Sequence, residues 1–387
     1  MDITELAKFR GVVSVDTITE LTSDSGVTVD GMLIKDGKTS SNNISWQEPT
    51  MFRNRIINGG FDIWQRGTTP GTMAASTQAG EYVSADRWKV GAVSFSVGYN
   101  FVSLTQLSTG LPTGVKFAGK VTSTAAGTDA ICIGQYIESA NSYSLVGQKL
   151  TVSMKLKKLA GFDTGTQIGI SVFSLGTADT ASTNMEAPAA GGCTLQFTTN
   201  HTLTTSDWET VTVTSSSVMP AAAANGLLLH IYYAKTDMGA SEKFAVAQVQ
   251  LEPGTVATPF EFRPYGTELA LCQRYFYRPG FNTSIDTSSI MNFAMGASWL
   301  TTMADILIPF PVQMRDWPVL GKSPTIGNLC VLNTGSGALA LTGLVIQTNS
   351  TVGPTLRATV AGGLTVGAAT MLARVNINGY IDFSAEL

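Results

Sequence analysis

Short runs in which apolar and polar residues alternate recur along the chain, and they predict a protein built of β-strands. In the clearest run, Leu150–Leu156, every second side chain is apolar and the residues between them are Thr, Ser and Lys. The same period of two is found in Val93–Phe101, Ile168–Val172, Val211–Val213, Leu229–Tyr233 and Ala245–Leu251. This alternation, with turn residues between the runs, is typical of antiparallel sheets that bury one face. We therefore expect a β-sandwich over residues 51–275.

The first 50 residues predict a separate small module. Val27 and Val29 alternate with polar residues, and the apolar run Met32–Ile34 follows directly after Asp30-Gly31. Asp-Gly between apolar runs is a strong signal for a tight turn, and a second such pair stands at Asp36-Gly37. Short strands in a module of about 50 residues bury too little surface to be stable alone. We expect residues 1–50 to oligomerise, with copies of the chain as the simplest partners.

Residues 276–387 predict a second, smaller β-sandwich. Its candidate strands are Leu329–Leu332, Leu339–Gln347, Thr355–Val360, Met371–Ile377 and Ile381–Phe383. One short helix is expected at Thr267–Tyr275, just before this domain. Thr267 would cap the helix, and the negative charge of Glu268 in the first turn suits the helix dipole. The fold class predicted for the whole chain is all-β.

The composition excludes several classes of protein. Charged residues make up only 13% of the chain and hydrophobic residues 44%, the opposite of the balance found in disordered proteins. The net charge is −4 and no basic run stands out, so we expect no nucleic-acid partner. There is no run of 18 apolar residues, and the residues Met1–Glu5 do not resemble an export signal. We expect no membrane insertion.

The four cysteines, Cys132, Cys193, Cys272 and Cys330, are far apart in the sequence and include no CxxC pair. Zinc sites need clustered ligands, so this spacing does not predict one. Isolated cysteines in apolar stretches are usually buried thiols, which fits synthesis in a reducing cytoplasm. We expect neither a metal nor another cofactor. A calcium ion held by loop oxygens is a weaker alternative, because no compact Asp-rich loop stands out.

Signals of catalysis are weak. The only histidines are His201 and His230, and no nucleophile motif accompanies them. A pair of carboxylates could hydrolyse glycans, and the candidates on turns are Asp62, Asp86, Glu252 and Glu261. The nearby Arg66, Arg87 and Arg263 make ion pairs the simpler interpretation of these acids. We expect no catalytic residues and no enzyme activity.

Aromatic side chains in the last domain are candidates for glycan binding. Exposed rings can stack on the C–H faces of sugars, and Trp299, Trp317, Tyr277 and Phe281 could serve in this way. The competing interpretation is that these rings fill the core or an interface between subunits, where aromatic residues contribute most.

Several long sequence blocks resemble one family. They are NRIINGGFDIWQRG at Asn54–Gly67, YVSADRW at Tyr82–Trp88, QLEPGTVATPFEFR at Gln250–Arg263 and ELALCQRY at Glu268–Tyr275. Together they resemble a domain of tail-fibre and receptor-binding proteins of tailed bacteriophages, which is similar to the jelly-roll sandwiches of carbohydrate-binding modules. Further blocks are similar to fibre tips or to the elements before fibre domains, at Pro309–Leu320, Ser384–Leu387 and Asp16–Lys38.

The resemblance implies a homotrimeric fibre of the virion. Residues 1–50 would anchor it to other virion or tail proteins, the jelly roll of residues 51–275 would form its body, and residues 276–387 would be the tip that contacts host surface glycan. Such a protein is made in the host cytoplasm and released by lysis. One alternative is a decoration or fibre-adaptor protein without a ligand. Another is a polysaccharide depolymerase, although known tailspike depolymerases commonly use long β-helices and this chain lacks their repeats.

Overall fold

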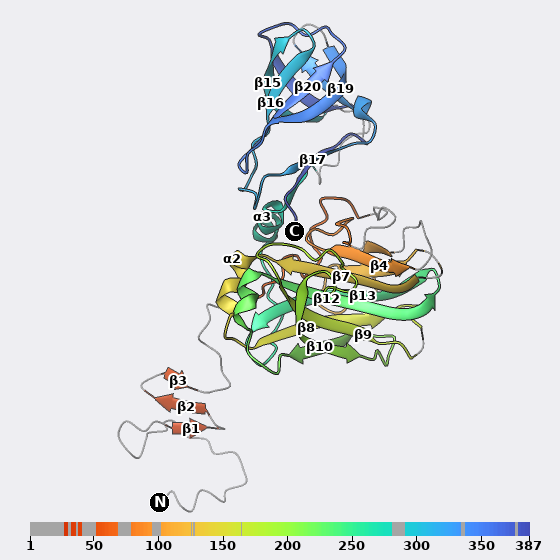
Figure 1. Ribbon diagram of the computed structural model, residues 1–387, viewed down its shortest axis with the longest axis vertical. Helices are drawn as coiled ribbons and strands as arrows, with labels where there is room; N and C mark the ends of the chain where they lie inside the picture. Colours follow the sequence, from red (N-terminus) through yellow and green to blue (C-terminus); the bar gives the residue numbers. More distant parts are fainter. Residues whose placement is uncertain are drawn as a thin grey trace, which may run out of the picture. The chain divides into compact units, whose positions relative to one another are not determined.

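The structure is a computed structural model (Figure 1) that describes residues 27–29, 32–35, 38–40, 52–68, 79–94, 102–124, 126, 128–163, 165–280, 291–333, 337–375 and 378–387. Contacts divide the chain into two compact units, Met1–Met51 and Phe52–Leu387. The described residues are almost all in strands, turns and loops, so the predicted all-β class is confirmed. None of the helices in the described ranges is long and apolar enough to cross a membrane.

The first unit contains a three-stranded antiparallel sheet of β1 (Val27–Val29), β2 (Met32–Lys35) and β3 (Lys38–Ser40). Val29 pairs with Met32 and Lys35 pairs with Lys38, so two residues separate each pair of strand ends. These positions flank the two Asp-Gly pairs. The strands predicted around Val27–Val29 and Met32–Ile34 are confirmed, whereas β3 was not predicted. That residues 1–50 form an oligomer stays a prediction. Val13 and Val15, which the sequence also suggests as strand residues, lie outside the described residues.

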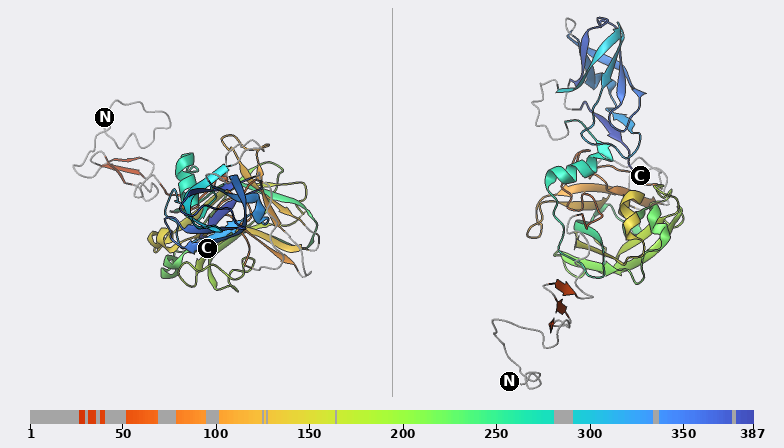
Figure 2. Two further views of the ribbon diagram at one scale, coloured as in Figure 1. Left: turned by 90° about the horizontal axis from the view of Figure 1, so that it is seen from above. Right: turned by 90° about the vertical axis from the view of Figure 1, so that its left-hand side faces the viewer.

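Ten strands of the second unit form a sandwich of two five-stranded sheets, in the orders β10-β9-β12-β7-β4 and β11-β8-β13-β6-β5 (Figures 1 and 2). The strands are β4 (Lys89–Ser94), β5 (Val102–Leu107), β6 (Ala118–Ser123), β7 (Thr128–Ile137), β8 (Leu150–Lys158), β9 (Ile168–Leu175), β10 (Cys193–His201), β11 (Glu209–Thr214), β12 (Leu227–Met238) and β13 (Ser241–Pro253). All neighbours within the sheets are antiparallel. The chain changes sheet at most connections, as in a jelly roll.

The core between the two sheets follows the period of two in the sequence. Leu150, Val152, Met154 and Leu156 of β8 are all buried there, as are Ile168, Ile170 and Val172 of β9. The sequence predicts one buried face for β9, yet all eight of its residues are buried. Its outer face packs under other chain segments, in a second apolar cluster that contains Phe173, Met185 and Leu228.

Short helical segments join the strands of the second unit: α2 (Ser139–Ser142), α3 (Tyr265–Gln273) and the 3-10 turns η1 (Tyr143–Leu145), η2 (Ala221–Asn225) and η3 (Ile326–Asn328). The helix predicted at Thr267–Tyr275 is α3, which begins two residues earlier. Pro264 occupies the N-cap position, so the prediction that Thr267 caps the helix is wrong. Glu268 does lie in the first turn. Its carboxylate accepts a hydrogen bond from the backbone N–H of Asn58 and binds Arg263.

The last part of the chain forms a closed six-stranded antiparallel barrel in the order β15-β16-β20-β19-β18-β21, drawn in cyan to blue in Figure 2. Its strands are β15 (Met291–Leu300), β16 (Met303–Leu307), β18 (Leu329–Asn333), β19 (Gly337–Thr348), β20 (Thr355–Val360) and β21 (Ala369–Arg374). The expected smaller sandwich is therefore replaced by a barrel, because β15 pairs with both β16 and β21 and closes the sheet. A separate sheet joins β14 (Phe276–Tyr277), β22 (Ile381–Ser384) and β17 (Val319–Lys322).

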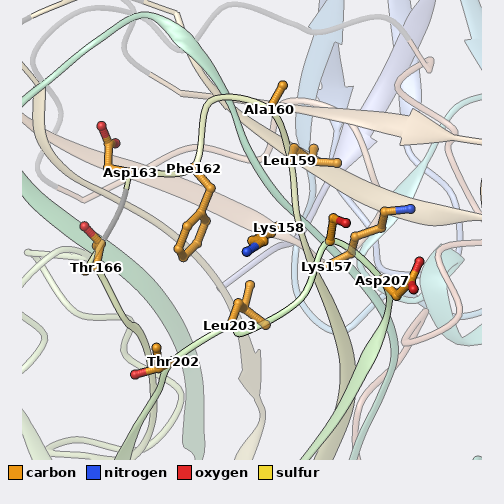
Figure 3. Close-up of a pocket in the computed structure, with 12 residues that line it drawn as sticks. Lys157, Lys158, Leu159, Ala160, Phe162, Asp163, Thr166, Thr202, Leu203 and Asp207 are labelled. Atoms are coloured by element: carbon orange, nitrogen blue, oxygen red, sulfur yellow. The ribbon is translucent and has the colours of Figure 1, made fainter.

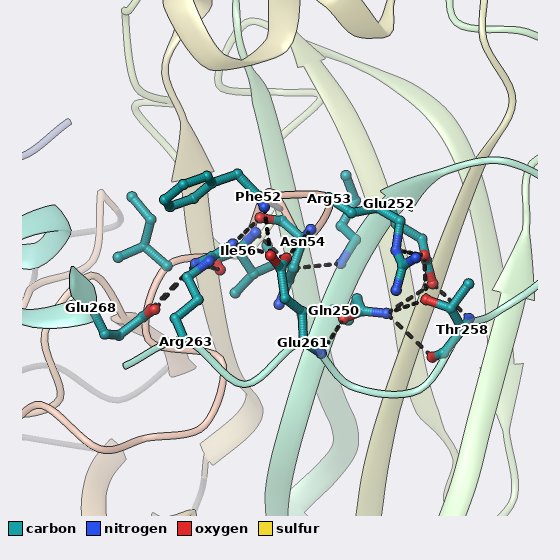
Figure 4. A network of polar contacts seen from close by, with 12 residues as sticks. Phe52, Arg53, Asn54, Ile56, Gln250, Glu252, Thr258, Glu261, Arg263 and Glu268 are labelled. Atoms are coloured by element: carbon teal, nitrogen blue, oxygen red, sulfur yellow. Dashed lines mark hydrogen bonds and ion pairs between the residues drawn. The ribbon is translucent and has the colours of Figure 1, made fainter. Parts of the chain in front are cut away.

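The first and last sequence blocks of the sandwich are joined by a polar network (Figure 4). The guanidinium of Arg263 donates hydrogen bonds to the backbone carbonyls of Asn54 and Ile56. The side-chain amide of Asn54 donates to the carbonyl of Val249 at 3.1 Å and accepts from the N–H of Leu251 at 3.0 Å. These blocks are about two hundred residues apart in the sequence and lie side by side in the fold, so their residues determine the fold together.

The last residues of the chain pack against the sandwich. The carboxylate of Glu386 binds Arg66 at 3.2 Å and also binds Arg87. Arg87 is buried, and its guanidinium lies 3.5 Å from the centre of the Tyr275 ring. The hydroxyl of Tyr82 donates to the carbonyl of Leu387 at 2.8 Å. The block at Ser384–Leu387 is therefore part of the packing of the second unit.

Candidate functional site

The aromatic residues predicted to bind glycan lie in different surroundings. Trp317 is 69% exposed and Trp299 is 45% exposed, with the guanidinium of Arg357 over the Trp299 ring at 4.7 Å. Tyr277 packs against Phe310 and Phe383 at the border of the barrel core. Among the described residues no ring contact joins the three predicted residues to one another. Phe281 lies outside the described residues.

The turn carboxylates are mostly engaged in ion pairs, as the sequence suggested. Asp86 is buried 3.6 Å from Arg66, and burial raises the pKa of Asp86 to about 6 although Arg66 acts to lower it. Glu261 lies 3.6 Å from Arg263. Glu252 pairs at 2.8 Å with Arg53, which the sequence did not single out. Arg87, the third arginine expected to pair with these acids, instead binds Glu386.

The four cysteines are buried, as expected. Within the described ranges, no three His, Cys, Asp or Glu side chains gather in a way that could hold a metal ion.

A groove of about 320 Å³ lies on the outer face of the sheet β10-β9-β12-β7-β4. Its side chains come from three neighbouring strands and from the connection between β9 and β10: Ser171, Phe173, Leu195, Thr198, His230, Tyr232 and residues 186–189. In β12 the side chains of Leu229, Ile231 and Tyr233 point into the core between the sheets. The pleat of the strand therefore turns His230 and Tyr232 to the outer face.

Glycines on the sheet make room for two side chains, Tyr232 and Met185, on its outer face. Gly169 pairs with Tyr232 across β9 and β12, and a Cβ atom at Gly169 would lie 2.0 Å from the tyrosine ring. The ring of Tyr232 therefore lies flat over Gly169. On the other side, Cβ atoms at Gly91 and Gly134 would lie 3.1 and 2.4 Å from the side chain of Met185. The buried Met185 fills the space over these two glycines and fixes the β9–β10 connection on the sheet.

His230 forms the floor of the groove. Its ring stacks on Tyr232, with centres 5.4 Å apart and planes 16° apart, and meets the edge of Phe173. The imidazole lies next to the backbone carbonyl of Met185, and its Nε2 atom is buried and has no partner among the described residues. Burial lowers the pKa of His230 to about 4, although the Met185 carbonyl acts to raise it. The ring is therefore neutral at pH 7.

The remaining groups of the groove combine apolar and hydroxyl surface. Leu195 is 46% exposed beside Phe173, and the hydroxyls of Ser171 and Thr198 lie 2.8 Å apart. The hydroxyl of Tyr232 donates to the side-chain carbonyl of Asn200 at 3.2 Å, which holds the ring in place. A flat ring, an apolar wall and the hydroxyl of Thr198 together suit a ligand that has an apolar face and hydroxyl groups.

Sequence reasoning treated His230 as a structural residue of a strand and did not single out Tyr232 or Phe173 for a site. The sequence carries only a weak sign of the groove. Leu228, His230 and Tyr232 are apolar or aromatic, but they alternate with Leu229, Ile231 and Tyr233, which are equally apolar. His201, the other histidine, lies at the end of β10 and binds Glu209 at 3.0 Å.

No known protein-family profile matches the sequence, and no curated protein matches it. Solved structures with a similar fold include the enzymatically active domain of tailspike protein 4 from bacteriophage CBA120, at 11% identity and a TM-score of 0.33. The match covers 52% of this chain and 22% of that one.

Carbohydrate-binding modules are also among the similar structures. TmCBM61, solved in complex with β-1,4-galactotriose, has 13% identity and a TM-score of 0.29, and the match covers 52% of this chain and 99% of that module. The CBM22-1 xylan-binding domain of Xyn10C from Paenibacillus barcinonensis has 12% identity and a TM-score of 0.25, over 49% and 99% of the two chains. At these TM-scores the matches do not indicate a function.

Proposed function

We propose that this chain is a fibre protein of a tailed-phage virion that binds host surface glycan, as a homotrimer, through the groove on the outer face of the sheet β10-β9-β12-β7-β4. The observation that carries the proposal is the flat, half-buried aromatic ring of Tyr232 in a groove whose apolar wall is formed by Phe173 and the exposed Leu195. The protein acts by binding and not by catalysis. It is made in the host cytoplasm and leaves the cell by lysis.

The chemistry of a sugar fits these groups. A pyranose ring has an apolar C–H face that can stack on Tyr232, and its hydroxyl groups can bond to the hydroxyl of Thr198, which also lines the groove. Nε2 of His230 is buried out of reach of water, so His230 supports the ring of Tyr232 by stacking and does not contact the ligand. Phe173 and Leu195 would cover the remaining apolar surface of the ring. Three such sites on one trimer reinforce one another when the host surface repeats the same sugar.

Glycan binding is tested with the purified full chain and a panel of neutral bacterial oligosaccharides, by array screening and then by calorimetry. Tyr232→Ala should lower the affinity about tenfold, the equivalent of roughly 1.4 kcal/mol. The matched control is Tyr143→Ala, since Tyr143 is 73% exposed and does not line the groove. Equal affinity of Tyr232→Ala and the unchanged chain would overturn the assignment of the groove. A trimer that binds no glycan would favour the ligand-free decoration or adaptor protein.

The fibre assignment rests on the sequence blocks and on the short strands of the first unit. Light scattering should give the mass of three chains. A trimer that falls apart when residues 1–50 are removed would locate the oligomer contacts in that segment, and a trimer that survives would locate them in residues 52–387. A monomer in both experiments would contradict the free fibre. Release of reducing sugar from host polysaccharide would support a depolymerase instead.

A further inference from the structure

A second cavity, of about 730 Å³, lies at the end of β8 (Figure 3). Its lining contains two lysines, Lys157 and Lys158, and two acids, Asp163 and Asp207. The lysines are consecutive residues of β8, so their side chains leave the strand on opposite faces, and Figure 3 shows their ammonium groups pointing apart. These four charges therefore do not define a binding site.

The outer surface of the barrel has a different character, because it is almost free of charge. The six strands of the barrel carry three charged residues in all, Asp305, Arg357 and Arg374. About a quarter of the residues in a typical soluble protein are charged. The sheet is closed and presents no strand edge to another molecule. A partner of the barrel must therefore recognise its outward side chains.

Large apolar side chains form a row across neighbouring strands of the barrel. Met295 of β15 is 66% exposed and pairs with Met371 of β21, which pairs in turn with Leu332 of β18. On the other side of β15, the register with β16 places Met295 next to Leu307, which is 54% exposed. Contiguous exposed apolar surface of this kind marks a site of interaction with another molecule.

A matched ion pair lies beside this row. Asp305 of β16 pairs with Arg357 of β20, and their side chains form two hydrogen bonds of 2.9 Å each. The guanidinium lies 4.7 Å from the centre of the Trp299 ring, which is 45% exposed. Hydrogen bonds from Arg357 and from the side chain of Trp299 lower the pKa of Asp305. The two charges are thus matched within one chain.

We call these three residues and the apolar row the barrel face; it consists of Met295, Trp299, Asp305, Leu307, Leu332, Arg357 and Met371. In a homotrimer, side chains near the three-fold axis meet their own copies from the other two chains. Like charges at such positions would repel one another, whereas apolar side chains and matched ion pairs do not. Met and aromatic residues are also enriched at interfaces between proteins. The barrel face is therefore compatible with copies of itself.

We propose that the barrel face packs against the barrel faces of the two other chains in the homotrimer. This inference rests on the homotrimer of the proposed function and adds the surface through which its chains meet. Met295 lies within the row, with apolar neighbours on both sides, so its copies come close to one another. None of the barrel-face residues lines the groove around Tyr232, so the contact does not use the glycan site.

Cross-linking of the full chain tests the contact. The four native cysteines are buried, so a bis-maleimide reagent reaches a cysteine introduced on the surface first. Met295→Cys and Leu307→Cys should each give covalently joined chains on a denaturing gel, several-fold more than the matched control Val256→Cys. Val256 is 63% exposed and follows β13 of the sandwich, away from the strands of the barrel.

A charge placed on the barrel face gives a second test. Leu307→Arg, added to Met295→Cys, would bring three like charges together near the axis. We expect it to lower the cross-linking at Met295→Cys several-fold, with the fold checked by circular dichroism.

Light scattering on the same samples separates the two ways to fail. A trimer in which neither Met295→Cys nor Leu307→Cys cross-links above the control would show that the barrel-face assignment is wrong, while the homotrimer stands. The same conclusion follows if Leu307→Arg, in a folded chain, leaves the cross-linking at Met295→Cys unchanged. A mass other than that of three chains would contradict the homotrimer itself, and this contact with it.

Discussion

At the scale of single residues, His230 supports the ring of Tyr232 and does not act as a base. Its imidazole is buried, stacks on Tyr232 and lies next to the Met185 carbonyl. A phenylalanine at this position would keep the stacking on Tyr232 but would lose the polar interaction with Met185. The support of the ring and the polar interaction can therefore be separated by mutation.

We expect His230→Phe to leave glycan affinity within about twofold, because the stacking on Tyr232 is kept, and to change the free energy of unfolding by about 1 kcal/mol, because the polar interaction with the Met185 carbonyl is lost. Calorimetric titration and urea unfolding measure the two effects. The control is Tyr143→Ala, which should change neither. A tenfold loss of affinity in His230→Phe would show that the imidazole itself contacts the ligand.

The low pKa of His230 also predicts how stability depends on pH. In the unfolded chain the imidazole takes up a proton near pH 6.5, whereas in the folded protein it does so only near pH 4. The unfolded state thus binds more protons in this interval, so the contribution of His230 is complete above pH 6.5 and is lost as the pH falls toward 4. Urea unfolding between pH 4 and 8 should show a steeper loss of stability in the unchanged chain than in His230→Phe. Parallel curves would contradict this assignment.

At the scale of the elements, the strands with large apolar side chains on one face could be predicted, and those with small ones could not. The strand at Thr355–Val360 was predicted with its observed bounds. The strand β15 was missed because most of its large side chains point outward: Met295, Trp299 and Leu300 are 66%, 45% and 40% exposed. Phe293 is the large side chain of β15 that packs against the core, while the small Ser298 is buried. A small closed barrel has little room inside, so the apolar bulk of β15 does not mark its buried face.

The groove could not be predicted from the sequence, for a related reason. Both faces of β12 are apolar or aromatic, so its alternation does not show which one bounds a ligand site. The outer face of this sheet is covered by the β9–β10 connection, and that cover depends on Met185 lying over Gly91 and Gly134 on two other strands. Such contacts between distant segments leave no local periodic signal. His230 and Tyr232 were therefore visible as strand residues but not as a site.

Gly169 gives a prediction at this scale. A methyl group in Gly169→Ala would lie against the ring of Tyr232 and push it off the sheet. Since Tyr232 is half-buried, the ring can move, and we expect a loss of stability near 1 kcal/mol together with a several-fold loss of glycan affinity. Gly239→Ala is the control, because a Cβ atom there meets no neighbouring atom within 4 Å. Equal affinity of the two variants would contradict the placement of Tyr232 in the site.

At the scale of the whole second unit, the contacts of Glu386 join the last sequence block to the first. Arg66 and Arg87 both lie close to this carboxylate, and their side chains are almost fully buried. Removing it would leave Arg87 without its buried partner. We expect Glu386→Ala to lower the free energy of unfolding by about 3 kcal/mol, measured by urea unfolding.

The matched control for Glu386 is Glu242→Ala. Glu242 pairs with Lys120 on the surface, where an ion pair contributes about 0–1 kcal/mol. Similar losses in the two variants would mean that the Glu386 contacts do not hold the last block in place.

The order of strands in the sandwich has a consequence for its synthesis. The central strand of each sheet is made last: β12 lies between β9 and β7, and β13 lies between β8 and β6. While the ribosome is still translating the chain, each sheet therefore remains split into two halves with unpaired edges. The sandwich can close only after β13 has left the ribosome, and its pairing of strands distant in sequence makes this a slow step. A nascent chain stalled before β13 should be open to proteases and chaperones, while one stalled well beyond it should resist digestion.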